Sequence, residues 1–136
     1  MATETFEDLK IWQEARRLTD TVYAITRQPS FMNDFGFINQ IRRAMIEISS
    51  KIAEGYERGG NREFSQSLAT AKGYAGEVRS QLYLAMDRGY IEKEKGETLI
   101  NEFKTLSRMI AGFTKYLKTA DTKGTTQKPR PENKGA

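Results

Sequence analysis

The sequence predicts an all-α protein, specifically an antiparallel up-down-up-down four-helix bundle. Two observations predict this fold. Four segments carry apolar residues at alternating steps of three and four, which is the spacing of a helix that buries one side. The connectors between these segments are short, which favours packing of each helix against its neighbour in sequence. No segment shows the apolar and polar alternation of a strand, so we expect no sheet.

The first predicted helix has an apolar side formed by Ile11, Ala15, Leu18, Val22 and Ile25. Thr5 or Asp8 is suited to cap its start, and Pro29 is predicted to end it.

The second predicted helix has one apolar and one charged side. The apolar side consists of Ile38, Ile41, Met45, Ile48 and Ile52. Asn33 or Asp34 is expected to cap the start, and the helix runs to about Arg58 before Gly59-Gly60 breaks it. The charged side contains two pairs in the favourable order, Glu47 before Lys51 and Glu54 before Arg58. We therefore predict that these charges pair with one another.

The third predicted helix keeps a heptad over Phe64, Leu68, Ala71, Ala75, Val78, Leu82 and Ala85. Asn61 is expected to cap it, Glu63 lies in its first turn, and Gly89 suits a left-handed position after its end. Its middle is thin because Gly73 and Gly76 accompany several alanines, at about 1 kcal/mol per glycine relative to alanine. We expect another backbone to approach it closely, from the same bundle or from a second subunit.

The fourth predicted helix has an apolar side formed by Leu99, Phe103, Leu106, Ile110, Phe113 and Leu117. Its start near Glu92 is weakly marked, and Gly96 is expected to let the first turn fray. The apolar pattern ends after Thr119. We predict that residues 1–119 form the bundle and that residues 120–136 form a disordered basic tail.

Several segments resemble a known bacterial family. Residues 40–44 read Gln-Ile-Arg-Arg-Ala, residues 52–55 read Ile-Ala-Glu-Gly, and the likeness extends over residues 6–118. They resemble the four helix bundle protein family, whose founding members are encoded in intervening sequences of 23S rRNA genes. The chain departs from the family pattern at Glu47, where serine is frequent, and at Lys51, where asparagine is frequent.

The resemblance implies an antiparallel four-helix bundle that assembles into ring-shaped homo-oligomers, commonly pentamers, with no settled biochemical activity. The accessory variability protein of diversity-generating retroelements looks like a distant relative of the chain. That likeness implies a pentameric bundle that engages nucleic acid and a reverse transcriptase, although the surface of that relative is far more basic.

The composition argues against catalysis. The 136 residues contain no His and no Cys, so the usual general base, nucleophile and transition-metal ligands are missing. We expect no enzymatic activity, no cofactor and no metal site. An all-carboxylate site at Glu47 and Glu54 is less favoured than pairing of these groups with nearby cations. The amino end lacks signal-peptide features and no apolar run is long enough to span a bilayer, so we expect a cytoplasmic protein that does not enter membranes.

Binding remains as the expected activity. The net charge is +4, but the segment from Asp121 onward holds four basic and two acidic residues, so the body is near balance. A weakly basic strip is nevertheless predicted to contact the phosphates of RNA or DNA, through Arg42, Arg43, Lys51, Arg58, Arg62, Lys72 and Arg79. A ring would multiply these contacts, and affinity rises steeply with their number. The alternative is a salt-bridged face with no ligand.

Aromatic residues beside the apolar seams suggest a second function, that of an oligomeric scaffold or adaptor that binds a protein partner. The predicted contact residues, with a second subunit or with such a partner, are Trp12, Tyr23, Tyr56, Tyr74, Tyr83 and Tyr116. For Trp12 and Tyr23 the competing interpretation is that they widen the core of a single chain.

Overall fold

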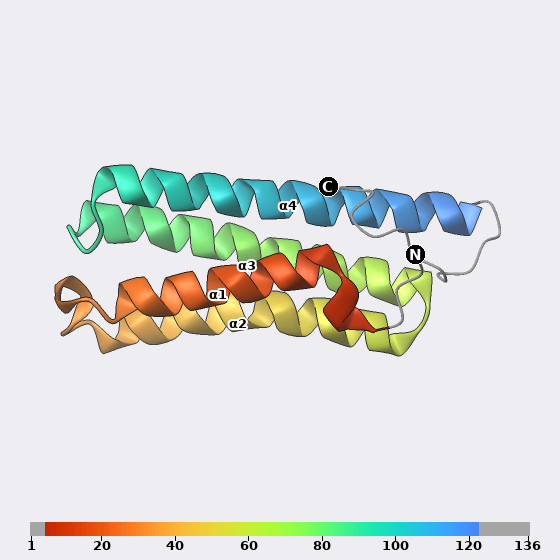
Figure 1. The fold of residues 1–136 in the computed structure, drawn as a ribbon, viewed down its shortest axis with the longest axis horizontal. Coiled ribbons are helices and arrows are strands. Elements are labelled where there is room, and N and C mark those ends of the chain that lie inside the picture. Colours follow the sequence, from red (N-terminus) through yellow and green to blue (C-terminus); the bar gives the residue numbers. More distant parts are fainter. Residues whose placement is uncertain (1–4, 123–136) are drawn as a thin grey trace.

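The computed structural model describes residues 5–122 and contains four α-helices and no strand in that range (Figure 1). The helices are α1 (Lys10–Thr26), α2 (Phe35–Arg58), α3 (Asn61–Asp87) and α4 (Lys93–Thr122). Two short 3-10 helices, η1 (Phe6–Asp8) and η2 (Pro29–Phe31), precede α1 and α2. The predicted all-α class is therefore confirmed. The ring-shaped assembly concerns several chains and stays a prediction.

Consecutive helices run in opposite directions, so the chain folds as two hairpins laid side by side (Figure 1). The most extensive packing is between α2 and α3 and between α3 and α4. With 17 residues α1 is much shorter than α4, which has 30, and α1 packs mainly on α2. The third helix therefore has a neighbour along both flanks, and a groove lies along each of them.

The predicted apolar sides form the core. Nearly every residue assigned to a seam is buried, including the whole heptad of α3 from Phe64 to Ala85. Phe31, Phe64 and Phe103 are the largest side chains that are fully buried. Ile38 is the exception, because it is only partly buried against the core.

Of the N-terminal caps predicted for α1 and α2, only the one for α2 is present. Neither Thr5 nor Asp8 caps α1, whose first helical residue follows Leu9, and the prediction is wrong because η1 occupies this stretch. Thr5 and Asp8 instead contact each other, with the Thr5 hydroxyl 3.4 Å from the Asp8 carboxylate. The prediction for α2 is confirmed, since the Asp34 carboxylate accepts the Phe37 N–H at 3.1 Å.

The glycines at the helix ends behave as predicted. Gly59 ends α2 with a φ of 93°, and Gly89 follows the end of α3 with a φ of 74°, both in the left-handed region that glycine adopts without strain. Asn61, however, is not the cap of α3. Gly60 holds the extended cap position, and Asn61 is the first helical residue, buried with its side-chain amide unpartnered among the described residues.

The start of α4 also differs from the expectation. Gly96 does not loosen the first turn, because it is buried and its N–H donates to the Glu92 carbonyl at 2.8 Å. A Cβ at Gly96 would lie against the flexible side chain of Met86, so glycine lets Met86 of α3 pack closely on the start of α4. At its other end α4 continues through Thr122, with Ala120 buried, past the predicted boundary at residue 119. The rest of the predicted tail, residues 123–136, lies outside the described residues.

Candidate nucleic-acid interface

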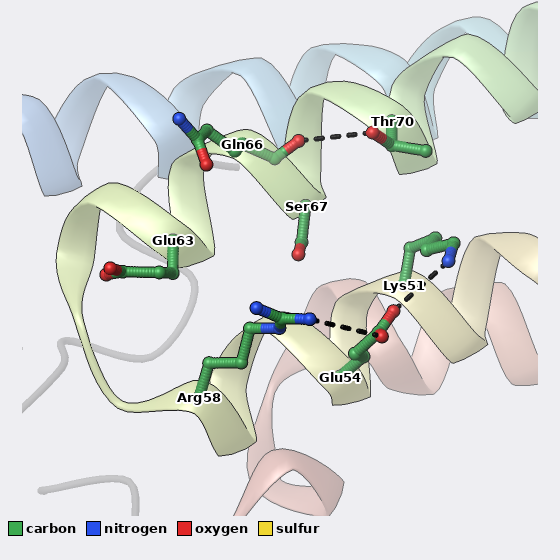
Figure 2. Close-up of a pocket in the computed structure, with 7 residues that line it drawn as sticks. All are labelled: Lys51, Glu54, Arg58, Glu63, Gln66, Ser67 and Thr70. Atoms are coloured by element: carbon green, nitrogen blue, oxygen red, sulfur yellow. Dashed lines mark hydrogen bonds and ion pairs between the residues drawn. The ribbon is translucent and has the colours of Figure 1, made fainter.

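The charged side of α2 faces a shallow groove against the first half of α3. Lys51, Glu54 and Arg58 line it from α2, and Glu63, Gln66, Ser67 and Thr70 line it from α3 (Figure 2). We call this the α2/α3 groove. Two of its side chains are cationic and two are carboxylates. Its charges are therefore balanced, and it does not present a continuous positive surface to a phosphate.

Of the two predicted pairs, Glu54 with Arg58 is confirmed, whereas Lys51 pairs with Glu54 and not with Glu47. Glu54 lies between the two cations, 3.1 Å from the Lys51 amine and 3.9 Å from the Arg58 guanidinium (Figure 2). Glu47 forms no ion pair with Lys51, because Lys51 turns toward Glu54 three residues onward. The hydrogen bond from Lys51 to Glu54 raises the pKa of the Lys51 amine above its ordinary value. Such exposed pairs contribute little to stability, because water and salt screen them.

A close backbone approach forms the floor of the same groove. Gly55, the last residue of the Ile-Ala-Glu-Gly segment, is buried where α2 crosses α3. A Cβ at this position would lie 2.6 Å from the Ser67 Cβ and 2.9 Å from the Phe64 ring. The absence of a side chain at Gly55 therefore sets how closely α2 and α3 pack.

Arg42 has a role within the fold. Its Nε donates to the Thr26 hydroxyl at 2.9 Å, and its guanidinium carbon lies 4.3 Å from the centre of the Tyr23 ring. The buried Thr26 hydroxyl itself donates to the Val22 carbonyl at 2.8 Å. Arg42 thus places its positive charge at the C-terminal end of α1, where a cation is favoured by the helix dipole. These contacts hold the partly exposed guanidinium against α1.

Three of the predicted phosphate-binding residues are exposed and form no ion pair within the described part of the chain: Arg43, Arg62 and Lys72. Arg43 lies on α2, whereas Arg62 and Lys72 lie on α3. The structure therefore divides the seven predicted cations. Lys51, Arg58 and Arg42 are engaged with other side chains, and these three are not.

The seventh cation, Arg79, belongs to a second groove. Ala69, Lys72, Gly73 and Arg79 of α3 line it together with Ser107 of α4. We call this the α3/α4 groove. Arg79 is half-buried and Ser107 is 7% exposed, and within residues 5–122 neither the Arg79 Nε nor the Ser107 hydroxyl has a hydrogen-bond partner.

The thin middle of α3 borders this second groove. A Cβ added to Gly73 or Gly76 would meet nothing within 4 Å, so no other backbone among residues 5–122 comes close to these two glycines. Of the two predicted sources of a close neighbour, the same bundle is therefore excluded for these positions. Ala71 and Ala75, by contrast, are fully buried in the core.

The sequence reasoning missed the cations of α4. Lys104, Arg108 and Lys115 are exposed, and no acidic residue occurs between Glu102 and Asp121. The signal was present in the sequence as an acid-free stretch of a long helix. It was overlooked because the apolar seam of α4 runs through the same residues.

The predicted contact aromatics fall into three groups. Tyr83 is half-exposed. Trp12, Tyr23, Tyr74 and Tyr116 are partly buried, and Trp12 packs edge-on against Phe6 with 5.2 Å between ring centres. Tyr56 is 7% exposed and lies edge-on to Phe64 inside the bundle, so it offers little surface to a second subunit.

Other large apolar side chains, which are not among the predicted contact aromatics, are also exposed. Met32, in the turn before α2, is 57% exposed, and Phe35, the first residue of α2, is 68% exposed; Ile46 and Leu84 are also exposed. These residues lie off the apolar seams, so the helical periodicity of the sequence gives no signal for them.

Within residues 5–122, no group of three acidic side chains is arranged to hold a metal ion. No helix in that range is long and apolar enough to cross a membrane.

These features define the molecule as an all-α, four-helix protein with two charged grooves flanking its third helix. The family model of the 23S rRNA-intervening sequence proteins matches residues 7–112. The chain therefore belongs to this family, as the sequence segments around Arg42 and Gly55 indicated. No curated protein matches the chain.

Proposed function

We propose that this protein is a non-enzymatic homo-oligomer that associates with RNA or DNA as an accessory protein. The observation that supports this best is the set of exposed cations without a carboxylate partner in the described residues, represented by Arg62 and Lys72 of α3 and Lys104 of α4. These charges stabilise no other part of the fold, and a phosphate can reach them without breaking an existing ion pair. Phosphate contacts of this kind supply most of the affinity of nucleic-acid binding.

Assembly is the second part of the proposal. Exposed Phe35 and Met32 provide apolar surface that a second copy would bury. A ring, with five subunits as the expectation from the family resemblance, repeats each weak cationic patch around its axis. Repeating a weak binding patch raises the overall affinity, because once the first patch has bound, the others bind within the same complex.

A salt titration of the intact protein tests this proposal. Labelled single-stranded RNA and DNA are mixed with the protein at about 50 mM salt, and binding is followed as the salt is raised to about 200 mM. Binding should be measurable at low salt and weaken steeply as the salt is raised. Binding releases cations held on the nucleic acid, and this release favours binding less when the surrounding salt concentration is high. Light scattering after size exclusion gives the subunit number. If the protein at micromolar concentration binds neither nucleic acid at low salt, the proposed nucleic-acid binding is rejected. If light scattering shows a monomer, the proposed assembly is rejected.

A protein-binding scaffold is the second candidate, and the exposed Phe35 and Met32 favour it. An apolar contact with a protein partner, such as a reverse transcriptase, responds little to salt. Weak salt dependence of partner binding, combined with no retention of nucleic acid, would therefore favour this candidate.

A further inference from the structure

We propose that the α3/α4 groove, rather than the charged side of α2, is where this protein holds single-stranded nucleic acid, and that it contacts the phosphate backbone there. This inference rests on the proposed function and assigns it to one face of the molecule. Four independent features of the groove support it: its shape, its unpartnered donors, the sign of its charges and an exposed ring at one end.

The shape of the groove suits close approach by an extended chain. Gly73 and Gly76 have open space where side chains would be, and Ala69 adds only a methyl group. The backbone of α3 is thus accessible from outside over about two turns. The helix gives up stability by using glycine here, at about 1 kcal/mol per residue relative to alanine. Packing inside the described residues does not offset that loss, so the compensation has to come from outside the chain, either from a second subunit or, as proposed here, from a bound ligand.

The unpartnered groups lining the groove are hydrogen-bond donors. Ser107 is 7% exposed and its hydroxyl has no partner within the described residues, although threonines on the same helix donate to the carbonyl four residues earlier. The Arg79 Nε, which is only a donor, is also buried and unpartnered there. Leaving such groups unsatisfied is costly. Both are satisfied by one kind of partner, an oxygen acceptor, and phosphate is rich in these.

The charges around the groove have a single sign over most of its length. On α4, Lys104, Ser107, Ala111 and Lys115 recur at steps of three and four, so they share one side of the helix. Lys72 lines the groove from α3. Glu77 follows Gly73 by one turn and so borders the outer edge of the groove, but no acidic residue is among those that line it. A phosphate in this groove meets cations with no carboxylate between them.

An exposed aromatic ring extends the groove and favours a single strand. Tyr83 is half-exposed and follows Arg79 by four residues, one turn further along the same side of α3. Stacking of a base on an exposed ring, next to a cationic groove, is the usual arrangement in proteins that bind single strands without sequence preference. A base in a duplex is stacked on its neighbours and is not free to stack in this way.

Matched triple variants of the full chain test the assignment. The first is Lys72→Gln with Lys104→Gln and Lys115→Gln, which removes three cations from the α3/α4 side. The control is Arg43→Gln with Lys51→Gln and Arg58→Gln, which removes three cations from α2. Both variants change the net charge equally, and all six residues lie on the surface or are half-exposed, so folding should be preserved. Affinity for a fluorescent 20-nucleotide RNA and for the DNA of the same sequence is measured by anisotropy.

We expect the α3/α4 triple variant to lose at least tenfold in affinity at about 50 mM salt, and its dependence of log affinity on log salt to become shallower by about 2. The α2 triple variant should lose less than about threefold. Equal losses would overturn the assignment while leaving nucleic-acid binding intact, because only net charge would then matter. Failure of the unchanged protein to bind either strand would instead reject the proposed function itself.

Two further variants test the shape and the ring without changing charge. Gly76→Leu fills open space on α3 and should weaken binding at least fivefold without lowering the melting temperature. Tyr83→Ala should weaken binding of single strands at least fivefold and leave duplex binding nearly unchanged. If Gly76→Leu changes the subunit number seen by light scattering, the groove holds a second copy of the chain, and the proposal is wrong.

Discussion

The two flanks of α3 are built in opposite ways. On the α2 flank the helices are in tight contact at Gly55, and Glu54 forms ion pairs with both Lys51 and Arg58. On the α4 flank Gly73 and Gly76 face open space, and the lining donors of Arg79 and Ser107 have no partner in the described residues. Both flanks contain glycine and cations, so composition alone makes them look alike. The difference shows that the charged groups of the α2 flank find partners within a single chain, whereas the lining donors of the α4 flank do not find them in the described residues.

The largest effect is expected where the α2 flank is tightest. Gly55→Ala should lower the free energy of unfolding by about 1–2 kcal/mol, because overpacking against Ser67 and Phe64 outweighs the better helix propensity of alanine. Urea denaturation followed by circular dichroism measures this change.

The matched control is Gly73→Ala on the α4 flank. There the new methyl group meets nothing, so only the propensity gain remains and stability should rise by about 0.5–1 kcal/mol. If both substitutions change stability in the same direction, the two flanks do not differ as described.

A second effect separates neighbouring arginines on α2. Arg42→Ala removes the hydrogen bond to Thr26 and the contact with the Tyr23 ring, and we expect a loss of about 1.5 kcal/mol. Arg43→Ala removes an exposed side chain with no ion pair in the described residues and should change stability by less than about 0.5 kcal/mol. Thermal unfolding of both variants measures the contrast. Equal losses would show that Arg42 is no more a part of the fold than Arg43.

The smallest effect concerns the end of the bundle where both flanks finish. Asp34 accepts hydrogen bonds from the Tyr90 hydroxyl at 2.7 Å and from the Phe37 N–H, and these hold the pKa of its carboxyl below the ordinary value of 3.8. Because the carboxyl has a lower pKa in the folded state than in the unfolded state, its charged form stabilises the fold at pH values above the ordinary pKa. This stabilisation is lost as the pH falls through the lowered pKa of the folded state. The bundle should therefore lose stability below about pH 4.

Melting temperatures measured between about pH 2.5 and pH 7 check this dependence. Asp34→Asn should melt below the unchanged protein at neutral pH, and the difference should shrink toward pH 2.5. Tyr90→Phe keeps the capping carboxylate but removes the hydroxyl, so it should show a weaker form of the same trend. A difference that stays constant with pH would mean that Asp34 does not act through its charge.

The sequence by itself determined the helices and the residues they bury. Burial repeats with the period of the helix, so the seams of all four helices could be read from spacing, and the ends at Gly59 and Gly89 from the left-handed backbone that glycine permits. The cap at Asn61 was misplaced by one residue, because Gly60 and Asn61 are both suited to a helix start and the local sequence does not choose between them.

Only the tertiary structure decided which cations are available to a ligand. Arg42 and Arg43 are adjacent in sequence, yet one contacts α1 and the other faces outward. The same holds for the glycines, since Gly55 meets α3 and Gly73 meets nothing. The physical reason is that periodicity reports which side of a helix is buried, whereas the partner of an off-seam residue depends on which other helix lies beside that flank.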